Sequence, residues 1–293
     1  VNAATTGSAD VVLDSQQRNQ QARRKPEDQK AAILEAPGIQ VATVEARTIL
    51  TGHEDWVTAL AVSGDGRRLI SGDNSSHVFV WDLESHARVA TWNGYPWNGI
   101  FSTALSADGQ TALVSESRFK RDDFDIPAPG LKVWHVMDGS ERSDLLKLQF
   151  PKLDTTKSTY GAAQVWRKFV AGGLIGAVFS ADEKWIAVGQ AGETDSGKVH
   201  LFDRESGKLV RTVSGHRNGV CDVKFSADSK YVLSSGRDTM IRICQVEDGK
   251  EVAALGKERG GQFKDWLHAI AISPNQKTVA AADIAGMVHV WQL

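Results

Sequence analysis

The stretch that decides the fold is residues 215–255, which read GHRNGVCDVKFSADSKYVLSSGRDTMIRICQVEDGKEVAAL. Three apolar runs alternate with short polar turns, and a weaker fourth run, Val252–Leu255, ends the stretch. Small and β-branched residues fill the runs almost continuously, as is typical of strands buried on both faces. Asp228 stands in the first turn, where its carboxylate can accept backbone hydrogen bonds and make the reversal tight. The stretch therefore predicts four short antiparallel strands in succession.

This pattern recurs along the chain, and the recurrence decides the architecture. The predicted first strands all end in Ser and span residues 55–63, 98–106, 172–180, 218–226 and 265–273. The second strands are Arg68–Ser71, Thr111–Ser115, Trp185–Gly189, Tyr231–Ser235 and Thr278–Ala282. The third are His77–Trp81, Leu131–Trp134, Val199–Phe202, Met240–Cys244 and Met287–Trp291, and the fourth are Val89–Trp92, Leu145–Leu148, Leu209–Val213 and Val252–Leu255. Four antiparallel strands repeated radially predict an all-β fold, a β-propeller with five recognisable blades.

Marker dipeptides make the pattern resemble the WD40-repeat family. Gly52-His53 and Gly215-His216 precede first strands, and Trp81-Asp82 ends a third strand. The resemblance covers about residues 47–293. It implies a rigid propeller that serves as a scaffold in larger assemblies.

The family resemblance also implies a hydrogen-bonded chain inside each blade. Its members in the fourth repeat are His216, Ser234 and Asp238, while Cys244 stands where the family has Trp. In the other repeats the pattern is thinner. Three residues depart from it: Ser75 and Ala285 at the Asp position, and Phe263 at the His position.

The residues before the repeats differ from them in composition, because all 22 aromatic residues lie from Trp56 onward. We expect residues 1–46 to form a polar, aromatic-free extension, with short helices over Ser8–Arg24 and Glu27–Glu35. This extension either contacts a partner or belongs to the main fold. Because the chain begins at Val1 and not at Met, we expect a processed or trimmed form.

Ring closure depends on the last repeat, which has no fourth strand after its third. We expect Arg47–Leu50 to supply that strand and to cover the open edges of the ring. Six or more blades stay open as an alternative, since Ile39–Glu45 suits a third strand of a degenerate sixth blade.

Insertions single out one rim of the propeller. The segments Ser117–Gly130, Phe150–Ala171 and Gly192–Gly197 follow second or fourth strands, and both kinds of loop open on the same face. The turns on the opposite face are short in every repeat. Surface loops accept insertions at little cost, so the asymmetry can be neutral, but it predicts a functional surface on that rim.

The rim holds the candidate binding residues. Tryptophans at the starts of first strands would anchor a partner if exposed, or would wedge between blades if buried. Arginines beside the second-to-third turn would clamp a carboxylate, or would simply be solvated. The predicted partner-binding residues are Trp56, Trp97, Trp266, Arg217, Arg237, Arg121, Asp123 and Trp166.

Composition excludes several classes of function. A net charge of −2 gives no sign of nucleic-acid binding, and no apolar run approaches the length of a membrane-spanning helix. The two cysteines and the spacing of the carboxylates suggest no metal site and no cofactor. Gly192–Lys198 matches part of a phosphate-binding loop, but a strand follows it where a helix is needed. The cysteine usage suits the cytoplasm and does not exclude a bacterial periplasm.

The sequence thus predicts a non-catalytic scaffold that binds a protein or peptide through its rim, as a subunit of a larger assembly. The alternative is an enzyme or cofactor site at the mouth of the central channel. Only Asp55, Asp222 and Asp265 have suitable first-strand positions for it.

Overall fold

The structure is a computed structural model of the 293-residue chain. It describes residues 48–94, 98–118, 131–142, 174–190, 197–217, 219–258 and 266–293. The chain divides into two units, Val1–Ile49 and Leu50–Leu293, and all described strands lie in the second. Within the described ranges the regular elements are strands, and no helix there is long and apolar enough to cross a membrane.

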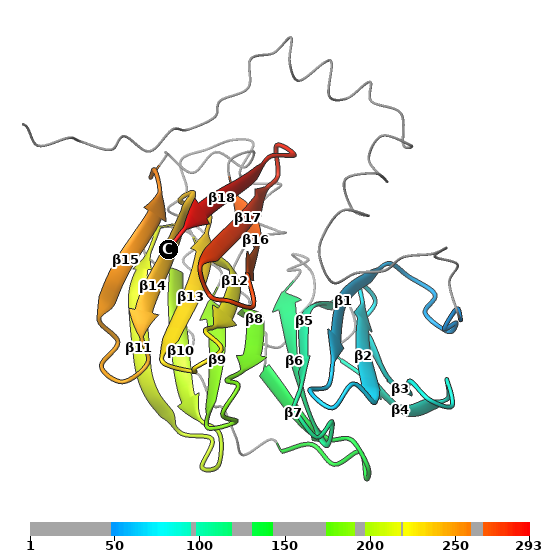
Figure 1. Ribbon diagram of the computed structural model, residues 1–293. Coiled ribbons are helices and arrows are strands. Elements are labelled where there is room, and N and C mark those ends of the chain that lie inside the picture. Colours follow the sequence, from blue (N-terminus) through cyan, green and yellow to red (C-terminus); the bar gives the residue numbers. More distant parts are fainter. Residues whose placement is uncertain are drawn as a thin grey trace, which may run out of the picture. The chain divides into compact units, whose positions relative to one another are not determined.

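The described strands form five antiparallel sheets, which we call the first to fifth blades (Figure 1). The first blade comprises β1 (Val57–Val62), β2 (Arg68–Asp73), β3 (His77–Asp82) and β4 (Arg88–Asn93), and the second comprises β5 (Asn98–Leu105), β6 (Thr111–Arg118) and β7 (Leu131–His135). The third comprises β8 (Leu174–Phe179), β9 (Trp185–Gln190), β10 (Gly197–Asp203) and β11 (Leu209–His216). The fourth comprises β12 (Val220–Phe225), β13 (Tyr231–Gly236), β14 (Met240–Gln245) and β15 (Glu251–Gly256), and the fifth comprises β16 (Leu267–Ile272), β17 (Thr278–Asp283) and β18 (Val288–Gln292). These strands agree with the sequence pattern; the expected strand Leu145–Leu148 lies outside the described residues.

The turn after each first strand is built by a Ser and an acidic or amide residue. In the first blade, Ser63 Oγ donates to Asp65 Oδ1 at 2.6 Å and accepts from Arg68 N at 2.9 Å. The other blades repeat the contact at 2.6 Å, in the pairs Ser106–Asp108, Ser180–Asp182, Ser226–Asp228 and Ser273–Asn275. The side chain therefore fixes the hairpin, as the sequence suggested.

Apolar side chains on both faces of the strands hold neighbouring blades together. Between the third and fourth blades, for example, Leu201, Val220 and Val223 are completely buried. First strands of successive blades lie against one another in the order β1, β5, β8, β12 and β16. Each internal blade therefore buries one apolar face against the preceding blade and the other against the following blade.

A second tie joins the blades at the turns that follow the first strands. In the third, fourth and fifth blades a turn residue with φ of 60° reaches back and accepts a backbone N–H from the preceding blade. The contacts are Ala107 N to Glu183 Oε1 at 2.7 Å, Asp182 N to Ser229 Oγ at 3.0 Å and Ala227 N to Gln276 Oε1 at 3.0 Å. The first blade has Gly66 at this place and no side chain to reach back with.

The outer faces of the first and fifth blades are uncovered within the described residues. Leu60 is 64% exposed, although the residues at its position in the other four blades are all buried. Val290 is 60% exposed, and again the corresponding residues elsewhere are buried. Thr48, Ile49 and Leu50 form no strand, and the fifth blade has three strands in the described region. The closing strand and the possible further blades therefore stay predictions.

Candidate interaction surface on the rim of the first blade

The rim of the first blade is formed by residues 52–56, which precede β1, and residues 74–76, which join β2 to β3. Asn74 N donates to the carbonyl of Trp56 at 3.0 Å, so the two segments lie side by side. Ser76 has a φ of 70°, and Thr239, at the same place in the fourth blade, has a φ of 67°. The two turns therefore share one backbone conformation.

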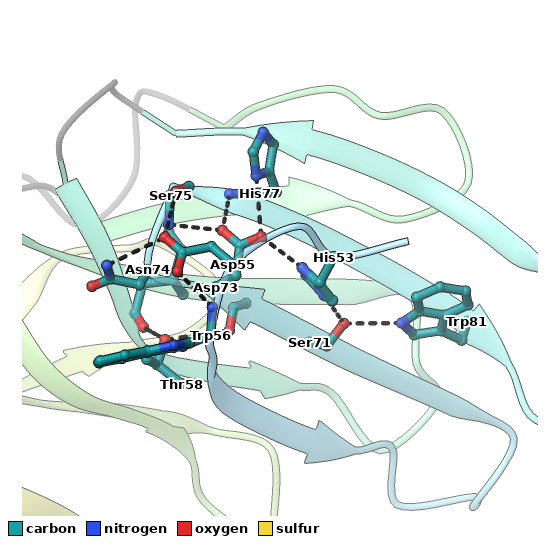
Figure 2. Close-up of polar contacts among 12 residues, drawn as sticks. His53, Asp55, Trp56, Thr58, Ser71, Asp73, Asn74, Ser75, His77 and Trp81 are labelled. Atoms are coloured by element: carbon teal, nitrogen blue, oxygen red, sulfur yellow. Dashed lines mark hydrogen bonds and ion pairs between the residues drawn. The ribbon is translucent and has the colours of Figure 1, made fainter. Parts of the chain in front are cut away.

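A hydrogen-bonded chain fixes this rim to the blade (Figure 2). His53 Nδ1 lies 2.8 Å from Asp73 Oδ2, and His53 Nε2 lies 2.7 Å from Ser71 Oγ. Trp81 Nε1 donates to the same hydroxyl at 2.9 Å. A neutral imidazole with its proton on Nδ1 satisfies every member, because Ser71 then donates to Nε2. The chain of contacts links the segment before β1 to β2 and β3.

The carboxylate in this chain comes from a residue that sequence reasoning missed. Ser75 occupies the position of Asp238, yet the first blade uses Asp73, two residues earlier. Asp73 is completely buried and also accepts from the backbone N–H groups of Ser75, at 3.0 Å, and His77, at 2.8 Å. Burial alone would raise the pKa of Asp73, but hydrogen bonds from His53 and from the backbone and ring of His77 hold it below its usual value.

The fourth blade shows why the two positions are alternatives. There His216 Nδ1 lies 2.9 Å from Asp238 Oδ1, and His216 Nε2 lies 2.8 Å from Ser234 Oγ. Gly236 stands at the position of Asp73, and a Cβ atom on it would lie 2.2 Å from the His216 ring nitrogen. Either position can supply the carboxylate, but both cannot be filled by large side chains.

The fifth blade also uses the last residue of its second strand, since Asp283 Oδ2 lies 3.0 Å from His289 Nε2 while Ala285 stands at the position of Asp238. Its histidine, however, comes from the third strand β18 and not from the segment before the first strand. In the first and fifth blades the sequence signal is an Asp at the last position of the second strand. The remaining motif residue, Asp82, caps the turn after β3: its carboxylate accepts from the backbone and hydroxyl of Ser85, both at 2.7 Å.

Above the network, Asp55 and Trp56 face outward. The Asp55 carboxylate accepts from Ser75 Oγ at 2.5 Å, from Trp56 N at 2.7 Å and from Asn74 Nδ2 at 3.3 Å. The Ser75 and Trp56 hydrogen bonds hold the pKa of Asp55 below its usual value, so the group is charged at neutral pH. The side chain of Trp56 is 80% exposed. The rim therefore presents an oriented carboxylate beside an accessible indole (Figure 2).

Two of the predicted rim residues lie together in a different way from the expected one. The guanidinium carbon of Arg237 lies 4.4 Å from the centre of the Trp266 ring, and Arg237 is only 6% exposed. The expectation of an arginine open to a partner carboxylate is therefore corrected, because the indole of the next blade covers its side chain. Trp266 is half-buried by this contact and is closer to the wedge that the sequence left as the alternative.

Arg217 is exposed and pairs with Glu258 at 3.0 Å, while its backbone N–H donates to Asp238 at 3.1 Å. The other predicted rim residues and the insertions lie outside the described residues, and their roles stay predictions. These residues are Trp97, Arg121, Asp123 and Trp166, with the segments 119–130, 143–173 and 191–196.

Of the acidic residues named for a channel site, the structure describes Asp55 and Asp222, and each is held by hydrogen bonds of its own. Asp222 accepts from Val223 N at 2.8 Å and from Ile270 N at 3.0 Å, so it joins the fourth blade to the fifth. Asp265 lies outside the described residues. Among the residues that the structure describes, no group of three or more His, Cys, Asp or Glu residues is arranged to hold a metal ion.

Comparison with known proteins agrees with this geometry. The family model for the WD domain, G-beta repeat, matches residues 45–82 and 207–244, which contain the first and fourth His–Asp pairs. Autophagy-related protein 16 of Arabidopsis thaliana is 23% identical over 257 residues, covering 82% of this chain and 48% of the relative. WD repeat and SOCS box-containing protein 1 of Danio rerio is 28% identical over 247 residues, covering 83% of this chain and 50% of the relative. The chain thus spans about half the length of these relatives.

Proposed function

Since the chain is a WD40-repeat protein, we propose that it is a non-catalytic scaffold that binds a protein or peptide through its rim. The observation that carries the proposal is the exposed indole of Trp56 on a rim held by the His53–Asp73 chain. A tryptophan buries a large area with few rotatable bonds, so it is well suited to anchor a partner.

The rigidity of the rim supports this proposal. Asp73 fixes the segment before β1, and Asp55 fixes the turn before β3 through Ser75 and Asn74. A surface that is already ordered loses less conformational entropy when a partner binds. The rim of the first blade therefore has a low entropic cost of binding.

Membership in a larger assembly is part of the same proposal. Two of the relatives are named as an autophagy-related protein and a SOCS box-containing protein, and each is about twice as long as the matched region. In this proposal residues 1–46 are a second contact with the partner or a tether, and the insertions of the second and third blades enlarge the rim. A propeller ring closed by Arg47–Leu50 remains the predicted fold of the scaffold.

The test is partner capture from the native source with wild-type protein and the Trp56→Ala variant. The matched control is Val252→Ala, which also shortens an exposed apolar side chain but lies on the outer strand β15. We expect the partner, identified by mass spectrometry, to be lost with Trp56→Ala and kept with the control, while the Tm of both variants stays within about 2 °C of wild type. If the Trp56→Ala variant captures the partner as well as wild type does, the partner does not bind through the rim of the first blade.

A further inference from the structure

The chain contains two tryptophans at the same blade position, and one of them has an arginine over it. Trp56 and Trp266 each stand seven residues before the Ser that ends the first strand. Both use their carbonyl to accept a backbone N–H from the second-to-third turn of their own blade, from Asn74 at 3.0 Å and from Ile284 at 3.3 Å. The two indoles are therefore presented by the same backbone arrangement.

In the fifth blade a side chain of the fourth blade covers the face of the indole. Arg237, in the second-to-third turn of the fourth blade, lies over the Trp266 ring at 4.4 Å. Attraction between a guanidinium and the face of an indole is favourable, and arginine is the cation most often found there. The molecule thus shows which side chain this position accepts.

In the first blade the indole is open and lies beside negative charge. Trp56 is 80% exposed, whereas Trp266 is half-buried. Asp55 is the adjacent residue, and Glu54 next to it is also exposed. The Asp55 carboxylate accepts three hydrogen bonds, which leaves room for one more donor among about four lone-pair sites.

We propose that Trp56 and Asp55 form a binding site for an arginine side chain of the protein partner, with the guanidinium over the indole and one N–H donated to the carboxylate. This inference rests on the proposed function and names the chemistry of the partner at that rim. Arginine fits better than lysine, because a planar guanidinium can stack on the ring and donate from its edge at the same time. The partner is therefore a peptide or protein segment that presents an exposed arginine.

If the ring closes, the fifth blade competes with the partner's arginine for the space beside Trp56. Ile284 holds the position in the fifth blade that Arg237 holds in the fourth, as its backbone contact with Trp266 shows. Direct packing of the fifth blade on the first would set Ile284 against Trp56 and leave no place for an incoming guanidinium. The experiment must therefore measure the accessibility of Trp56 as well as binding.

We would record NMR spectra of the full chain labelled with ¹⁵N at the tryptophan indoles and assign the Trp56 signal by its loss in Trp56→Phe. The probes are the capped peptides Gly-Gly-Arg-Gly-Gly and Gly-Gly-citrulline-Gly-Gly, which differ in charge but hardly in shape. We expect the arginine peptide to shift the Trp56 signal saturably, with at least about fivefold weaker binding of the citrulline peptide. Asp55→Asn should weaken arginine binding by about threefold or more, whereas Asp65→Asn, a matched carboxylate on the opposite turns, should not.

Three results would overturn the inference: no saturable shift, equal binding of both peptides, or protection of the Trp56 indole from a soluble paramagnetic agent. The last result would point to cover by the fifth blade. Failure of this inference can be distinguished from failure of the proposed function. If partner capture depends on Trp56 but the arginine peptide does not bind, only this inference is refuted.

Discussion

The structure makes a sharp prediction about which carboxylate holds the first blade together. Replacing Asp73 by Ala removes the acceptor for His53, for the His77 ring at 3.1 Å and for the backbone N–H groups of Ser75 and His77. Replacing Ser75, the residue at the position of Asp238, removes one exposed hydrogen bond to Asp55. The family pattern read from the sequence does not anticipate this difference.

The magnitudes follow from burial. Leaving a buried donor without its acceptor costs roughly 1–3 kcal/mol, and the completely buried Asp73 accepts from His53 and from two backbone N–H groups. We therefore expect Asp73→Ala to lower the free energy of unfolding by about 3 kcal/mol or more, or the Tm by about 6–12 °C for a unit of this size. Ser75→Ala should cost less than about 1 kcal/mol, because its hydrogen bond is solvent-exposed.

The assay is urea unfolding, combined with native-state hydrogen exchange of the amides of β1 to β3, since repeat proteins need not unfold as one unit. A third variant makes the test sharper: Asp73→Gly combined with Ser75→Asp rebuilds the arrangement of Gly236 and Asp238. It should recover a large part of the stability lost in Asp73→Gly alone. A greater cost for Ser75→Ala than for Asp73→Ala, or no recovery in the double variant, would refute the reasoning.

The other predictions concern titration, thiol reactivity and the uncovered faces. Burial, with a smaller contribution from Lys198, lowers the pKa of His200 to about 4. The free energy of unfolding should therefore fall by at most about 3 kcal/mol as the pH drops from 6.5 to 4. Urea unfolding curves recorded over this pH range should show a smaller change for the His200→Gln variant. Burial raises the thiol pKa values of Cys221 and Cys244 to about 11, so both should react with a thiol reagent only at the rate of unfolding, and fast labelling of native protein would contradict this. Val80→Ala should cost about 2 kcal/mol and the corresponding Val290→Ala under about 0.5 kcal/mol by urea unfolding; equal costs would show that the outer face of the fifth blade is covered in solution, as ring closure requires.

The strands and turns were predictable from the sequence, because their causes are local. Continuous runs of small and β-branched residues, such as residues 186–189, indicate strands buried on both faces, whatever their neighbours are. A Ser two residues before an Asp fixes a hairpin with groups from the same turn, as Ser226 and Asp228 do. These features need no knowledge of the other blades.

The site was predictable only in part, because its causes lie between segments. Trp56 was named from its position, but its exposure depends on what packs against the first blade. Arg237 was expected to be exposed, yet the ring of Trp266, 29 residues later in the chain, covers it. Asp73 was missed since a motif fixes a position, whereas the imidazole of His53 requires only a carboxylate within reach.

The turn contacts of the last three blades all run the same way, from a side chain of one blade to the backbone of the preceding blade. Each of the last three blades holds on to its predecessor through the side chain of Glu183, Ser229 or Gln276. Continuing this series from the fifth blade back to the first would need a side chain at the place of Gly66. Gly66 has no side chain, so a fifth-to-first junction would be a seam without this tie. Transient opening of the scaffold should start at the seam, beside Trp56, and leave the second to fifth blades as one cooperative body.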